Sequence, residues 1–168
     1  MVRGFTIALS FLVSTLAAGP VFGQAASESN VVTATVNIAP LAKLNLSALS
    51  LTFPDTNPDT TPQVAAASGP LTITARARAT PASTVTLTIR ALDDLRSGTD
   101  VIPASAVSWT ASGNGFVDGT LSAAADRAVG SWPTSGLHSG QQIFLFQNSW
   151  SWATGNYTVT LVYTLTAP

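Results

Sequence analysis

The chain has 168 residues, of which 46% are hydrophobic and only 9% charged, and its formal net charge is −1 at pH 7. It contains no cysteine, which excludes disulfides, thiolate metal sites and thiol catalysis. With no basic patch in the sequence, nucleic acid and anionic membranes are not expected as partners. A chain of this length can bury a core large enough to fold without a disulfide or a metal ion.

The N-terminus has the three parts of a secretory signal peptide, and we assign residues 1–23 to it. A basic start precedes an apolar run of about a dozen residues, which is shorter than the roughly 20 residues that span a bilayer. We therefore expect cleavage after Gly23 or Ala25 and no membrane span in the mature protein. The prediction is an exported protein, extracellular, at the cell surface or in the periplasm. Residues 24–30 are predicted to be a flexible lead, and residues 31–168 a single domain.

Alternation of apolar and polar residues predicts strands in the first half of that domain. Residues 31–38 predict the first strand, which the following proline ends. One or two short strands are expected within 43–53, and four prolines predict a long loop over 54–70. Residues 71–78 and 84–91 alternate again, and their short connector predicts an antiparallel hairpin with arginines and threonines on one solvated face.

The residue pattern in the second half of the chain predicts five further strands. They cover residues 107–111, 116–121, 128–132, 141–148 and 156–166. The first is centred on Trp109, which we expect in the core, and a Gly-Asn-Gly turn leads to its return strand. Residues 133–140 look turn-rich, so His138 is expected in a solvated turn. The strand over 141–148 is apolar on both faces, which predicts either a central position or one face given to a partner. The last strand alternates tyrosine and leucine with threonine and closes a sheet.

Strands recur at intervals of roughly ten residues, with turn residues between them and no helical periodicity. This pattern predicts an all-β fold: an antiparallel immunoglobulin-like β-sandwich of about seven to nine strands that follows a cleaved signal peptide. We expect the strands to form two sheets.

No set of residues suited to catalysis or metal binding stands out. His138 is the only imidazole and no G-x-S-x-G elbow is present. Asp93 and Asp94 are neighbours in a turn rather than two carboxylates across a cleft. Oxygen side chains in 55–59 are spaced like the opening of a calcium loop, but the glycine and glutamate of such a loop are missing. We therefore expect no catalytic residue, no metal, no cofactor and no enzymatic activity.

Trp150 and Trp152 are the candidate ligand-binding residues. Because they are two apart, they would point the same way in an extended chain and could form a flat platform for a sugar ring. The alternative is that both pack against the end of the sandwich, since tryptophan buries a large apolar area.

Two stretches carry resemblances to known families. Residues 155–168 resemble the end of bacterial WxL-type cell-surface domains and residues 108–112 their first tryptophan motif, although Tyr163 and Ala111 replace a tryptophan and a leucine of the two motifs. The general plan is similar to spore-coat-U and other pilin-like secreted sandwiches, in which a glycine-tyrosine turn precedes a threonine-rich last strand. The WxL resemblance implies noncovalent attachment to the cell wall. The pilin-like resemblance implies assembly by strand exchange.

Together these features favour an exported, non-enzymatic structural or adhesive cell-surface protein. Its expected partner is cell-wall polysaccharide or another surface protein, and the bacterial origin follows from the resemblances. Two alternatives stay open. One is a carbohydrate-binding module that uses Trp150 and Trp152. The other is a self-assembling pilin-like subunit in which residues 31–38 pair with the sheet edge of a neighbour.

Overall fold

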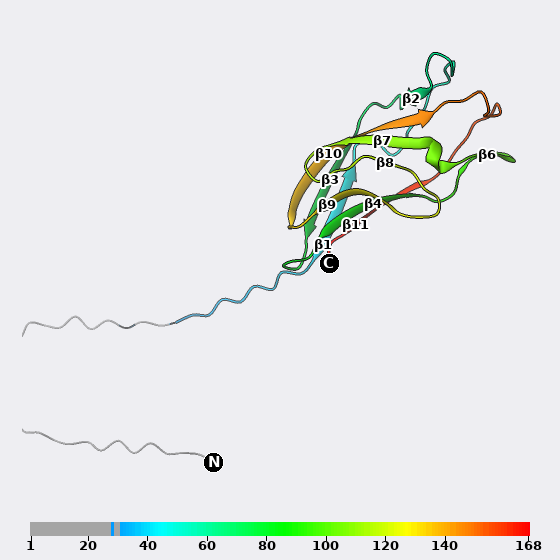
Figure 1. Ribbon diagram of the computed structural model, residues 1–168. Coiled ribbons are helices and arrows are strands. Elements are labelled where there is room, and N and C mark those ends of the chain that lie inside the picture. Colours follow the sequence, from blue (N-terminus) through cyan, green and yellow to red (C-terminus); the bar gives the residue numbers. More distant parts are fainter. Residues whose placement is uncertain (1–27, 29–30) are drawn as a thin grey trace, which may run out of the picture. The chain divides into compact units, whose positions relative to one another are not determined.

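The computed structural model describes residue 28 and residues 31–168, so the predicted signal peptide and most of the predicted lead lie outside the described residues. Residues 37–168 form one compact unit (Figure 1). Its strands are β1 (Leu41–Leu46), β2 (Gln63–Ala65), β3 (Leu71–Arg78), β4 (Val85–Ala91), β5 (Leu95–Ser97), β6 (Asp100–Ile102), β7 (Val107–Ser112), β8 (Gly119–Thr120), β9 (Arg127–Trp132), β10 (Gly136–Gln147) and β11 (Leu161–Thr166). Two antiparallel sheets pack against each other, which confirms the predicted all-β sandwich.

The larger sheet has the order β1-β3-β10-β7-β8, and β2 pairs with one end of β10. The twelve-residue β10 is its central strand, as the apolar faces of 141–148 predicted. It begins five residues earlier, at Gly136, inside the stretch predicted to be turns. Gly140 explains the difference: a Cβ there would lie 2.5 Å from the Phe116 ring and from the Ser112 carbonyl oxygen. This glycine serves close packing within a strand rather than a turn.

The smaller sheet has the order β11-β4-β9, and a separate pair joins β5 to β6. The predicted closing strand is confirmed as β11, although it is shorter than 156–166. Within the part of the chain that the structure describes, it pairs only with β4 and so forms a sheet edge. The preceding residues contribute one isolated bridge, between Thr158 and Arg96.

The predicted hairpin of β3 and β4 is wrong. Both strands exist with the expected alternation, but β3 pairs with β1 and β10 whereas β4 pairs with β11 and β9. The connector therefore crosses from one sheet to the other, and the Thr80 amide in it donates to the carbonyl oxygen of Pro168 at 2.7 Å. Alternation places a strand's apolar face toward the core, but it does not say from which sheet.

The predicted first strand over 31–38 is also wrong. Residues 31–40 are in no strand, and each is exposed. The first strand is β1, three residues further along. A strand needs a partner edge, and no strand of this chain pairs with 31–38 in the described residues.

The core lies between the two sheets. Strands β3 and β4 supply alternate buried side chains from opposite sides, with Ile73, Leu87 and Ile89 wholly inaccessible to solvent. Trp109 is 1% exposed, which confirms the prediction of a core residue, and its ring lies 6.1 Å from that of Phe144. The periodicity of the strands thus identified the inward faces correctly.

Candidate functional site

The two lateral sides of the sandwich differ in how they are sealed. On the first, which we call the closed side, the segment around β8 meets β9. The Val117 amide donates to the Val129 carbonyl oxygen, and the Ser131 amide to the Gly115 carbonyl oxygen, each at 3.0 Å. The Trp109 indole N–H donates to the Val117 carbonyl oxygen at 2.9 Å. Backbone hydrogen bonds between the two sheets therefore leave little free edge on this side.

On the opposite, open side, β1 and β11 lie side by side (Figure 1). Each has a ladder partner on one edge only, β3 and β4 respectively, and no ladder pair joins them within residues 31–168. Their inward-facing side chains are only partly buried, unlike those of the neighbouring strands. They are Leu44, Leu46, Leu161, Tyr163 and Leu165. The open side thus combines two free main-chain edges with apolar surface that is not fully covered.

Tyr163 connects the open side to the core. Its hydroxyl donates to Gln142 Oε1 on β10 at 2.5 Å, so the bond spans the two sheets. Gln142 is wholly buried, and its Nε2 has no hydrogen-bond partner in the described residues. Burial raises the pKa of the Tyr163 hydroxyl well above its ordinary value, because the charged phenolate would be poorly solvated there.

Residues 31–38 are a separate feature of the chain. Val31 is 94% exposed, Val36 is 80% exposed and Ile38 is 66% exposed. In an extended chain, alternate positions of this segment share one face, and that face is apolar. Its members are Val32, Ala34, Val36 and Ile38. The segment alternates like a strand and has no pairing partner among the described residues, and the sheets have edges without a partner there. A segment of the first type can pair with an edge of the second.

The structure separates the two candidate ligand-binding tryptophans. Trp152 is partly buried against the core, and its indole N–H donates to the Gln147 carbonyl oxygen at 3.0 Å. Trp150 is 70% exposed, and its indole N–H donates to Asp59 Oδ1 at 2.9 Å. Only Trp150 therefore offers a broadly exposed ring, and the carboxylate of Asp59 fixes its edge.

His138 does not lie in a solvated turn, contrary to the prediction. It is on β10 and its ring stacks on that of Trp132, with centroids 4.4 Å apart and planes inclined by 10°. Its Nε2 is buried and has no hydrogen-bond partner in the described residues. Residues 136–140 continue the central strand, so the alternation of β10 turns this side chain inward.

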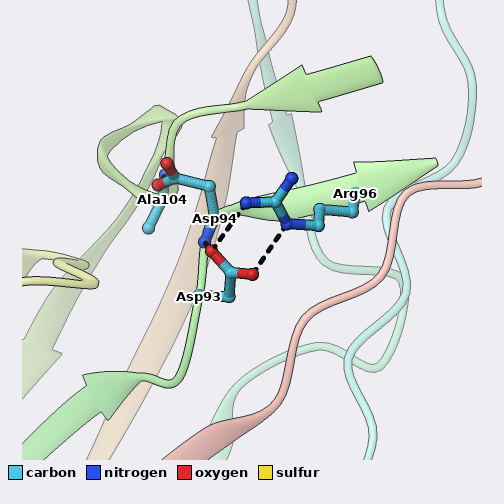
Figure 2. Close-up of polar contacts among 4 residues, drawn as sticks. All are labelled: Asp93, Asp94, Arg96 and Ala104. Carbon is cyan, nitrogen blue, oxygen red and sulfur yellow. Dashed lines mark hydrogen bonds and ion pairs between the residues drawn. The ribbon is translucent and has the colours of Figure 1, made fainter. Parts of the chain in front are cut away.

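The carboxylates singled out in the sequence serve the local fold. Figure 2 shows Asp93 facing Arg96, whose Nε donates to Asp93 Oδ2 at 2.7 Å. The hydrogen bond from Arg96 and that from the Asp94 backbone N–H lower the pKa of the Asp93 carboxyl. Asp94 Oδ1 accepts from the Ala104 amide at 2.8 Å. These contacts hold the turn before β5.

The loop over 55–59 has the geometry of an Asx turn, because Asn57 Oδ1 accepts from the Asp59 amide at 2.9 Å. The Asp59 carboxylate accepts the hydrogen bond from the Trp150 indole N–H. Among the described residues, no group of three or more histidine, aspartate or glutamate side chains is placed to hold a metal ion.

The fold also gathers residues that sequence reasoning left apart. Pairing of β1 with β3 places Lys43 opposite Arg76, with Arg78 two residues further along the same face. The alternation of 71–78 already put both arginines on one face, but nothing in the sequence located Lys43 beside them. The sequence has no basic run, yet the folded protein has a basic patch.

A scan against protein-family models and a search of curated proteins each found no match to this chain. The only helical element in the described part of the chain is a three-residue turn, Ala104–Ala106, and no described helix is long and apolar enough to cross a bilayer.

Proposed function

We propose that the protein is a non-enzymatic structural subunit of an exported, cell-surface assembly. Residues 31–38 of one copy add as a strand to the open side of a second copy. The observation that carries the proposal is that every residue of 31–38 is exposed although the segment alternates like a half-buried strand. A second copy is the partner because the chain supplies both halves of the contact.

The first argument is the apolar surface that stays in water. Full burial of one valine or isoleucine side chain contributes about 1.5–3 kcal/mol. Val32, Val36 and Ile38 lie on one face of residues 31–38, each with most of its surface exposed. Contiguous exposed apolar surface of this kind marks an interaction site.

The second argument is that the segment is poorly placed to pair with its own β1. Such a hairpin would turn at Ala39-Pro40, a two-residue loop. Two-residue hairpin loops take turns that need positive φ, and they favour Asn-Gly or glycine. Proline is held at negative φ, so it cannot adopt the second central position of the common type I′ turn. The connection therefore favours a partner strand from another copy.

The third argument is the match between the two surfaces. An added strand gains affinity from main-chain hydrogen bonds and specificity from alternate side chains that enter the core. The free edges of β1 and β11 supply the first. The partly buried Leu161, Tyr163 and Leu165 supply apolar surface for the second. The eight residues of 31–38 are long enough to pair with all six residues of β11.

The resemblances noted in the sequence support the same proposal. The likeness to pilin-like sandwiches agrees with assembly by strand exchange, and the likeness to WxL-type domains agrees with noncovalent attachment to the cell wall. Export agrees with the predicted signal peptide, which lies outside the described residues. Cell-wall polysaccharide or another surface protein would then be the support on which the assembly stands.

The test exploits the two faces of the segment. Val32→Asp/Val36→Asp places charges on the apolar face, whereas Thr33→Asp/Thr35→Asp adds the same charge to the polar face. We expect the wild-type protein and the threonine pair to assemble in size-exclusion chromatography with light scattering, and the valine pair to be monomeric. A buried, unpaired carboxylate is strongly unfavourable, which is the reason for the difference.

The absence of native cysteine allows a direct check of the contact. A mixture of two single variants, Thr35→Cys and Thr164→Cys, should form an intermolecular disulfide on mild oxidation only if the segment lies along β11. A wild-type protein that is monomeric from micromolar to millimolar concentration would refute the proposal. So would identical assembly of both aspartate pairs.

A second candidate function rests on Trp150. An exposed indole whose edge is fixed by Asp59 is suited to stack on the C–H face of a sugar ring. Trp150→Ala should then abolish binding to a neutral glucan without changing the melting temperature. Trp152→Ala is the comparison, and we expect it to lower the melting temperature because that ring packs against the core. Unchanged glucan binding by Trp150→Ala would exclude this function.

A further inference from the structure

A groove on the outer face of the larger sheet collects half of the basic residues found in residues 31–168. Lys43 on β1 is the register partner of Arg76 on β3, and Leu41 is the partner of Arg78. Directly opposed residues on antiparallel strands have Cβ atoms about 5 Å apart, and residues two apart on one strand about 7 Å. The three cations therefore lie within reach of one ligand.

These cations line a groove of about 560 Å³, together with Leu41 and Leu137. We call it the cationic groove. The two leucines are 59% and 61% exposed, so its apolar wall is open to solvent. Leu137 is the register partner of Arg76 on the other neighbouring strand, β10. One row across three strands thus presents Lys43, Arg76 and Leu137.

No acidic side chain among the described residues forms a salt bridge with the cations of the groove. Strands β1, β3 and β10 contain no aspartate or glutamate. The only salt bridge in the described residues joins Asp93 and Arg96, so none involves the groove. Like charges directly opposed across two strands destabilise a sheet. An anion bound in the groove would relieve this repulsion.

We infer that the cationic groove binds an acidic polysaccharide, a function separate from the proposed strand assembly. Each arginine offers a planar fork of N–H donors that matches a carboxylate, and Lys43 adds a third point of positive charge. Spaced cations suit a polymer that repeats its anions, because several weak contacts act together. Leu41 and Leu137 provide apolar surface for the C–H groups of the sugar rings.

Two other polyanions fit less well. Single-stranded nucleic acid is bound through aromatic side chains on which the bases stack, and no aromatic residue lines the groove. Recognition of an anionic membrane surface takes clusters of about four to eight cations, more than the three present. The overall net charge of −1 also gives no long-range attraction to either.

The test compares two charge-matched double variants of the purified protein. Arg76→Gln/Arg78→Gln removes two cations from the groove, and Arg90→Gln/Arg127→Gln removes two from the strands of the smaller sheet. Binding to polygalacturonate is measured by titration calorimetry at low and high salt, with dextran as the neutral polymer. We expect the groove variant to lose about tenfold in affinity, the loss of two exposed charge contacts, and the matched variant to bind as the wild type does.

The wild-type affinity for polygalacturonate should fall with added salt, whereas any binding to dextran should be the same in the wild type and in Arg76→Gln/Arg78→Gln. Equal losses in both double variants, or no loss in either, would overturn the inference. Tighter binding to single-stranded DNA or to anionic lipid vesicles than to polygalacturonate would overturn the choice of polysaccharide.

Three further measurements complete the test. Arg76→Gln/Arg78→Gln removes the like charge that faces Lys43, so its melting temperature should equal or exceed that of the wild type. Lys43→Gln alone should also weaken binding to polygalacturonate. The assembly-deficient Val32→Asp/Val36→Asp variant should retain polygalacturonate binding per subunit at high ligand concentration. If that variant is monomeric and still binds, the groove stands on its own. If assembly fails to occur even in the wild type, the groove is tested unchanged.

Discussion

The closed and open sides of this sandwich are built from similar strands, but they differ in whether backbone hydrogen bonds join the two sheets. On the closed side, backbone hydrogen bonds from Val117 and Ser131 tie the segment around β8 to β9, and the Trp109 indole fixes Val117 from inside. On the open side, β1 and β11 touch without a ladder, and Tyr163 reaches only Gln142 across the core. A strand edge whose backbone groups are already hydrogen-bonded is not free to pair again, whereas an unpaired edge can bind another strand.

Under the proposed function, the open side is the part of the molecule that binds a second copy. The closed side is complete within one copy. The open side leaves main-chain groups and apolar side chains available, and the chain carries an exposed segment of strand type, residues 31–38. The following substitutions probe this contrast from the largest expected effect to the smallest.

Trp109→Ala should be the most damaging single change. The ring is 1% exposed and holds the closed side through its N–H. Truncation of a buried tryptophan lowers the free energy of unfolding by about 3–5 kcal/mol. Chemical denaturation measures the loss, with the exposed Trp150→Ala as the control that should stay within about 0.5 kcal/mol of wild type. A similar loss for both would contradict the assigned burial.

Gly119→Ala should also loosen the closed side. A Cβ at this position would overlap the Trp109 ring, so β8 could no longer approach β7 as closely. Overpacking of this kind costs about 1–3 kcal/mol of unfolding free energy. Gly69→Ala is the comparison: nothing lies within 4 Å of its Cβ, so its cost comes only from the positive φ of 70°. Fluorescence of the tryptophans should change for the first variant alone.

Tyr163→Phe tests the open side. Loss of the hydroxyl leaves the Gln142 side chain without a hydrogen bond among the described residues, at a cost of about 1–2 kcal/mol of unfolding free energy. The pH dependence is the sharper readout. Because burial raises the pKa of the folded hydroxyl above the ordinary value of about 10, the unfolded chain loses its proton first as the pH rises.

The contribution of Tyr163 to stability is therefore full below about pH 10 and falls above it, and the phenylalanine variant should lack that fall. Urea denaturation from neutral pH to beyond pH 10 compares the two proteins. Parallel curves would mean that the hydroxyl is solvated and that the open side is looser than described.

Asp93→Asn should have the smallest effect, since both partners of the Arg96 ion pair are exposed. The lowered pKa of Asp93 means that its contribution is present above the ordinary pKa of an aspartate and is lost as the pH falls through the lowered value. Salt should reduce the contribution further. Denaturation at acidic and neutral pH, with and without salt, checks the sign. A large loss at neutral pH would place this turn within the cooperative core.

Much of the strand content could be predicted from the sequence. Residues 71–78 and 84–91 alternate cleanly, and both appear as strands with the expected inward faces. Trp109 was placed in the core because a large apolar ring sat mid-strand. These properties are local, because the period of two is a property of the extended backbone itself.

Pairing could not be predicted in the same way. The connector between β3 and β4 suits a hairpin by length, yet it crosses between sheets, and Gly140 looked like a turn residue but sits where Phe116 packs closely. Residues 31–38 have the pattern of a strand and lack a partner edge in the described residues. Pairing depends on which edges meet, and that is a non-local property.

The candidate sites also combine features that the sequence determines with features that only the fold determines. The sequence determined the apolar face of 31–38, the shared face of Arg76 and Arg78, and the presence of two tryptophans near 150. Only the tertiary structure decided that Trp150 is exposed while Trp152 packs on the core, and that Lys43 completes a basic groove. The physical reason is that side-chain periodicity is fixed by backbone geometry, whereas exposure and charge clustering depend on strands brought together from distant parts of the chain.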